Sequence, residues 1–212
     1  MSIRSKMFGV ALLGALMGQA HAGVTFTFTQ SGSNVLMQSS GALDTSKLIG
    51  ADVFGWGGTG IESNHAPQSD IMGDTSAGDL DLAFRFSAGS NHGAWIDNLF
   101  SITFFNWASS GNTQFATFTK DGDERIPGIA ISAADLVGGL WTPDVSWIAD
   151  GTLAGLGLTA GTYTVTDNRS NEFITIQVGE RQAPQDVPEP GSLALLGLGL
   201  AGAAFARRKR TA

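Results

Sequence analysis

The chain has 212 residues, contains no cysteine and carries a formal net charge of −7. Without cysteine it has no disulfide, no thiol catalyst and no lipid-modified N-terminal cysteine. Residues 23–186 hold six lysines and arginines against eighteen aspartates and glutamates, a net charge of −12. Because nucleic acid and anionic membrane surfaces repel such an acidic segment, we expect neither as a partner.

The N-terminal residues have the pattern of a secretory signal peptide. Two basic residues precede an apolar run at 7–17, which is too short to span a bilayer. Ala20 and Ala22 then form an A-x-A cleavage site in front of Gly23. We therefore predict a signal peptide over residues 1–22, export by the Sec machinery and cleavage by signal peptidase.

Residues 23–179 are predicted to form one all-β ectodomain, a single β-sandwich or jelly-roll-like domain. Apolar residues alternate with threonine from Val24 to Thr29, the period of a half-buried strand, and a turn leads to its hairpin partner at 35–38. Further strands are expected at residues 48–54, 82–86, 95–107, 115–119, 126–131, 162–166 and 172–178, the last two as a hairpin. Many short strands without a long amphipathic helix are typical of sandwiches and jelly rolls.

Three segments interrupt this strand pattern. Residues 55–79 are rich in glycine and polar residues, so we expect a long loop that would line any site. One helical turn is expected after Ser132, whose side chain suits an N-cap. Residues 180–186 form a polar linker.

Motifs for catalysis are weak. Residues 55–60 match the letters G-x-G-x-x-G, but no helix pattern follows to hold a pyrophosphate. Neither G-x-S-x-G nor a P-loop occurs, and His65 and His92 lack the paired spacing of a zinc site. We therefore predict no catalytic residue and no enzyme activity.

Two groups of residues suggest ligand binding instead. Asp121, Asp123 and Glu124 crowd one turn, and such clusters bind calcium weakly in extracellular modules, so calcium is the one cofactor left open. Trp56 and Trp141 lie in loop-like contexts. If both indoles are exposed on one face, they would stack on sugar rings and indicate a carbohydrate-binding module. The alternative is that they belong to the core or fill a hydrophobic loop.

The C-terminal residues combine a proline-rich turn, an apolar run and a basic end. Val187, Pro188, Glu189 and Pro190 keep the backbone extended. The apolar residues 192–206 would form a transmembrane helix of about 22 Å, shorter than the ~30 Å core of a bilayer. It would be a marginal, temporary anchor.

The basic end sets the orientation of this helix. Arg207, Arg208, Lys209 and Arg210 are expected to stay in the cytoplasm, because positive charges are retained there. Everything before Val187 would then lie outside the inner membrane.

This order of elements over residues 187–212 resembles the PEP-CTERM sorting signal of Gram-negative bacteria. The resemblance implies that an exosortase, a membrane protease, recognises and cuts the chain at Val187, Pro188, Glu189 and Pro190. It also implies transient anchoring in the inner membrane, followed by a final location at the cell surface or outside the cell.

Three hypotheses for the function follow. The first is a non-enzymatic structural or interaction protein of the cell envelope or extracellular matrix, linked by the resemblance to exopolysaccharide and biofilm. The second is a carbohydrate-binding module that uses its tryptophans. The third is a hydrolase with an unrecognised site, which two carboxylates facing each other in a cleft would indicate.

Overall fold

The computed structural model describes residues 23–54, 56–65, 69–75, 79–90, 95, 105–111, 113–120 and 124–179. These residues form an all-β structure with three sheets and short 3₁₀ helices. The all-β class predicted from the alternating pattern is therefore confirmed.

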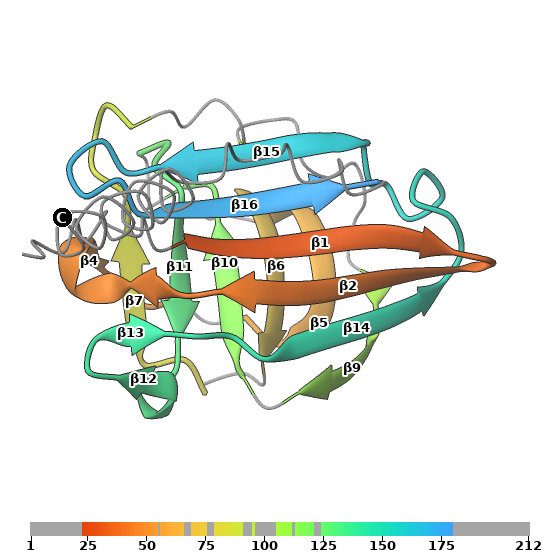
Figure 1. The fold of residues 1–212 in the computed structure, drawn as a ribbon, viewed down its shortest axis with the longest axis horizontal. Helices are drawn as coiled ribbons and strands as arrows, with labels where there is room; N and C mark the ends of the chain where they lie inside the picture. Colours follow the sequence, from red (N-terminus) through yellow and green to blue (C-terminus); the bar gives the residue numbers. More distant parts are fainter. Residues whose placement is uncertain are drawn as a thin grey trace, which may run out of the picture.

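One layer is a six-stranded sheet with the order β15–β16–β1–β2–β14–β9, which faces the viewer in Figure 1. Its strands are β1 (Gly23–Ser31), β2 (Asn34–Gly41), β9 (Ala108–Gly111), β14 (Val145–Asp150), β15 (Gly161–Thr166) and β16 (Phe173–Val178). All neighbours are antiparallel except β1 and β16, which are parallel. The first and last strands are thus hydrogen-bonded partners inside the sheet.

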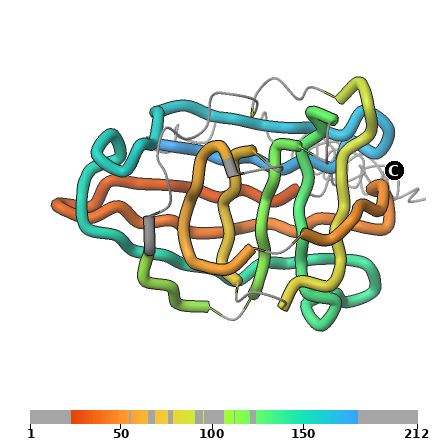
Figure 2. Tube along the Cα trace, turned by 180° about the vertical axis from the view of Figure 1, so that it is seen from behind, coloured from red at the N-terminus to blue at the C-terminus, as the bar shows by residue number. Residues whose placement is uncertain are grey.

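The second layer is a seven-stranded sheet with the order β4–β7–β11–β10–β6–β5–β8, seen from its own side in Figure 2. Its strands are β4 (Ile49–Ala51), β5 (Gly58–His65), β6 (Ser69–Thr75), β7 (Leu82–Arg85), β8 (Phe105–Asn106), β10 (Phe115–Phe118) and β11 (Gly128–Ile131). In Figure 1 these strands run behind the six-stranded sheet and cross its strands steeply.

A small third sheet lies at one end of the two layers. It consists of β3 (Leu43–Asp44), β12 (Leu136–Val137) and β13 (Leu140–Trp141). A 3₁₀ helix follows β3 at Thr45–Lys47, and another lies at Ala133–Asp135. Ser132 caps the latter by accepting a hydrogen bond from the Ala134 amide at 3.3 Å, as its sequence position predicted.

Aromatic side chains join the two large sheets. Phe26 on β1 is fully buried and stacks on Phe115 of β10, with ring centroids 4.8 Å apart. Phe115 also stacks on Trp147 of β14 at 5.9 Å. Because apolar residues alternate along β1, β2 and β14, one face of the six-stranded sheet is buried against the other sheet. The hydrophobic core lies between these layers.

Most of the predicted strands are present, and the predicted hairpins at both ends of the domain are confirmed. The strand expected at residues 95–107 lies mostly outside the described residues; β8 is the described strand within that range. The pattern also missed β9 and β14, which are short or flanked by polar residues.

The expected loop at residues 55–79 is wrong, because this segment contains the hairpin of β5 and β6. Glycine in this segment stands where a side chain would clash with its neighbours, so the alternation of apolar and polar residues typical of a strand is interrupted. A Cβ on Gly73 would lie 2.5 Å from the ring of Trp56 and 2.6 Å from the carbonyl oxygen of Phe115. Glycine is therefore required in β6 so that the indole can lie on the sheet.

Candidate functional site

The predicted sorting residues lie outside the described part of the chain. They are Ala20, Ala22, Val187, Pro188, Glu189, Pro190, Arg207, Arg208, Lys209 and Arg210. Gly23 is described and begins β1, where its carbonyl accepts a hydrogen bond from the Ala42 amide at 3.1 Å. Within the described ranges, which exclude residues 192–206, there is no helix with the length and apolar character needed to cross a membrane.

Trp56 and Trp141 do not meet the condition set for sugar stacking, which was two indoles exposed on one face. Trp56 is 5% exposed and Trp141 is fully buried, so neither indole offers a ring face to solvent. Trp56 covers Gly73 and donates its indole N–H to Glu62 Oε2 at 3.1 Å. Trp141 packs in the core against Phe115, with centroids 6.0 Å apart. Both side chains stabilise the fold because they fill space next to aromatic or glycine neighbours.

The predicted calcium cluster is described only at Glu124. Asp121 and Asp123 lie outside the described residues, and Glu124 forms an ion pair with Arg85 at 3.1 Å. Among the described residues there is no group of three or more histidines, aspartates and glutamates arranged to hold a metal ion. Asp74, from the predicted loop, instead accepts hydrogen bonds from Thr59 and from the Trp147 indole at 2.8 and 2.9 Å.

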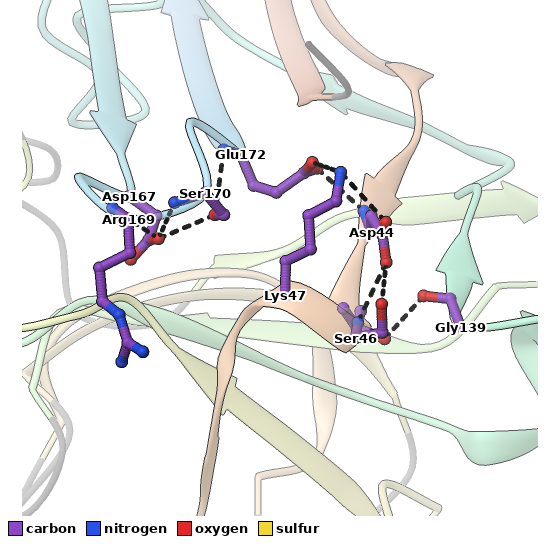
Figure 3. Close-up of polar contacts among 9 residues, drawn as sticks. Asp44, Ser46, Lys47, Gly139, Asp167, Arg169, Ser170 and Glu172 are labelled. Carbon is purple, nitrogen blue, oxygen red and sulfur yellow. Dashed lines mark hydrogen bonds and ion pairs between the residues drawn. The ribbon is translucent and has the colours of Figure 1, made fainter. Parts of the chain in front are cut away.

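Among the described residues, the most concentrated polar site is the turn between β15 and β16 (Figure 3). Asp167 is 1% exposed and lies where this turn meets the segment after β7. Its Oδ1 accepts hydrogen bonds from the Ser87 amide at 2.7 Å and the Ser87 hydroxyl at 2.5 Å. Its Oδ2 accepts from the Arg169 amide at 3.1 Å, the Ser170 amide at 2.7 Å and the Ser170 hydroxyl at 2.8 Å.

These hydrogen bonds control the protonation of Asp167. Burial by itself would raise the pKa of the carboxyl group, because it disfavours the charged form. The hydrogen bonds donated by Ser87 and Ser170 outweigh burial and lower the pKa to about 2. The carboxylate is therefore ionised at neutral pH and acts as a fixed acceptor that closes the turn.

A second buried carboxylate, Glu172, joins the same turn to the third sheet. Glu172 is 1% exposed, and its Oε1 lies 2.8 Å from Lys47 Nζ. Its Oε2 accepts a hydrogen bond from the Asp44 amide at 3.0 Å. Lys47 also pairs with the Asp44 carboxylate at 3.1 Å, and the two carboxylates raise the pKa of Lys47.

This arrangement of carboxylates is suited to stabilising the fold and not to catalysis or ligand binding. The oxygens of Asp167 and Glu172 are directed at donors of the protein itself, and Figure 3 shows them in two neighbouring groups along one turn. Sequence reasoning identified residues 167–171 only as a polar hairpin loop. An aspartate followed three residues later by serine is the signal that indicates such a side-chain-closed turn.

Comparison with known proteins gives one match. Residues 186–210 match the family model of the PEP-CTERM protein-sorting motif. No curated protein and no solved structure shows significant similarity to the chain. The chain thus carries a PEP-CTERM sorting motif, which implies export, transient membrane anchoring and processing by an exosortase, a membrane protease.

Proposed function

We propose that this chain is an exported, non-enzymatic protein of the cell envelope or extracellular matrix, with a structural or interaction role linked to exopolysaccharide or biofilm. The sorting motif at residues 186–210 is the observation that carries this proposal. The leader pattern before Gly23 supports export by the Sec machinery and cleavage by signal peptidase. After release of the tail, the working part would be the β domain at the cell surface or outside the cell.

Features of the described domain support a role without catalysis. Its two most buried carboxylates, Asp167 and Glu172, each hold a turn in place through hydrogen bonds or an ion pair. The two large sheets that share one core support a β-sandwich as the architecture of this working part. The proposed role requires no cofactor.

The test is to change the Pro-Glu-Pro segment of the protein in its own cells. Pro188→Ala, Glu189→Ala and Pro190→Ala are combined, and Gln182→Ala with Gln185→Ala in the linker serves as the control. An antibody against the domain follows the protein in inner-membrane, surface and medium fractions. We expect the triple variant to remain in the inner membrane and the control to be distributed like the wild type. Wild-type distribution of the triple variant would contradict exosortase sorting through this segment.

A further inference from the structure

The outer face of the six-stranded sheet carries regular rows of hydroxyl and amide side chains. The strand registers align one residue from each strand in a continuous row: Thr162, Gln177, Thr27, Gln38, Ser146 and Ser110. A neighbouring row consists of Thr164, Thr175, Thr25 and Ser40. Adjacent strands lie about 4.8 Å apart, so the longer row extends over about 24 Å.

These rows lie on the face opposite to the core. On β1 the core residues Val24, Phe26 and Phe28 alternate with Thr25 and Thr27, and side chains alternate between the two faces of a strand. Thr27 and Thr175, in the middle of the rows, are only 9% and 8% exposed. Figure 1 looks onto this face, and no strand that the structure describes lies in front of it. Gln38 and Thr162 are exposed.

The charge of this face differs from that of the rest of the domain. The six strands contain one charged residue, Asp150 at the end of β14, although residues 23–186 have a net charge of −12. The other acidic residues all lie outside these strands. The exposed members of the rows can therefore exchange hydrogen bonds with a neutral partner; they are Thr162, Gln38, Ser40 and Ser110. The Thr164 and Thr175 hydroxyls are hydrogen-bonded to each other at 2.8 Å. The charge of the whole domain repels an acidic polymer.

An aromatic ring lies beside the rows. Phe173 begins β16 and is half-buried, and it follows the outward alternation of Thr175. Its ring leans over Gly23 of β1, where an added Cβ would be 2.3 Å from Phe173 Cζ. The pair thus places a ring along the sheet surface next to Thr25 and Thr175. Aromatic rings beside hydroxyl groups suit sugars, whose rings have apolar faces and polar edges.

We propose that this face, consisting of the two rows and Phe173, binds an extended neutral polysaccharide. Each hydrogen bond competes with water and adds little by itself, but many sites along one chain act together. This proposal deepens the proposed envelope role because it names the class of partner. It rests on that role in one respect: the protein must be exported in order to meet the polymer. Binding does not require the sorting tail, so the two ideas fail in separate experiments.

The test measures how the purified exported protein binds insoluble neutral glucans, cellulose and curdlan, with alginate as an acidic comparison. The combined variant Gln38→Glu and Thr162→Glu introduces charge into the longer row at two exposed positions. Val137→Glu introduces charge at the β12–β13 tip, where Val137 is 81% exposed, and is the control. We expect the row variant to lose at least tenfold in affinity for the neutral glucan, with an unchanged melting temperature, and the control to bind like the wild type.

Three outcomes would overturn the proposal. The first is that the wild type binds neither glucan, and the second is that it binds alginate more tightly than the glucans. The third is that the row variant binds the glucans as tightly as the wild type. If the row variant does not fold, Phe173→Leu and Gln38→Leu are tested separately, and undiminished glucan binding by both folded variants would also overturn it. Failure of the sorting test with intact glucan binding would contradict the proposed sorting and leave this face as a binding surface.

Discussion

Asp167 shows how a single buried carboxylate makes stability depend on pH. Its pKa is lowered from 3.8 to about 2 by the Ser87 and Ser170 hydrogen bonds, despite burial. A carboxyl group with a lowered pKa stabilises the fold fully above its unfolded pKa, and this contribution is lost as the pH falls through its folded pKa. The loss therefore occurs between about pH 4 and pH 2, and the shift corresponds to about 2 kcal/mol.

Replacing this carboxylate tests the origin of that stability. We expect Asp167→Asn to lower the free energy of unfolding by about 2–3 kcal/mol at pH 7, because an amide cannot accept all the donated hydrogen bonds. The difference from the wild type should shrink between pH 4 and pH 2, where the wild-type carboxylate itself becomes protonated. Urea unfolding across this pH range measures both effects.

The matched control is Asp52→Asn, since Asp52 is exposed. Its effect should stay within about 0.5 kcal/mol. A gap between Asp167→Asn and the wild type that stays constant from pH 7 to pH 2 would show that the Asp167 hydrogen bonds do not depend on its charge.

The sequence pattern predicted some of the buried residues and missed others. It identified the alternating Val24, Phe26 and Phe28 as core, because periodicity is a local property of one strand. It could not identify Asp167 and Glu172 as buried, because their partners Ser87 and Lys47 lie far away in the chain. For the same reason the pattern left open whether Trp141 is exposed or part of the core.

At the scale of single strands, glycines in one sheet are expected to respond in opposite ways to alanine. Gly73→Ala in β6 would force a Cβ against the Trp56 ring and the Phe115 carbonyl. We expect a loss of about 1–3 kcal/mol from this overpacking. Gly50→Ala in β4 meets open space, so it should be neutral or stabilise by up to about 1 kcal/mol. Thermal unfolding of both variants checks the signs, and equal effects would contradict the packing of Trp56 on β6.

These glycines also explain why the strand pattern failed between residues 55 and 79. A period-2 pattern is visible where apolar side chains fill one face, as in β1. In β6 the indole of Trp56, which lies just before β5, covers the place where a side chain would be, and glycine interrupts the pattern. The register shift between Glu62 and His65 in β5 removes the remaining periodicity.

For the whole molecule, the stacked rings between the sheets predict one cooperative unit. Phe115→Ala removes contacts with Phe26 and Trp147 on the opposite sheet. We expect a loss of about 3–5 kcal/mol, with both sheets melting in a single transition. Ile148→Ala in β14 is the control, because Ile148 is 40% exposed and should cost little. Near-ultraviolet and far-ultraviolet circular dichroism that report two separate transitions would contradict a shared core.

The order of strands could not be predicted from the sequence. Hairpins such as β1–β2 and β15–β16 follow from short turns, but the parallel pair of β1 and β16 joins opposite ends of the domain. That pairing aligns Thr25 with Thr175 and Thr27 with Gln177, and so creates the polar rows from separate alternating strands. The alternation within β1, β2, β15 and β16 was therefore predictable, whereas the surface that the strands of this sheet form together was not.

The most direct test of the account is the intact mass of the protein recovered from the cell envelope and from the medium. We predict a protein that begins at Gly23 and ends between Val187 and Pro190, as sorting through the motif at residues 186–210 requires. A mass that extends through Ala212 in both fractions would contradict exosortase processing and identify the tail as a lasting anchor.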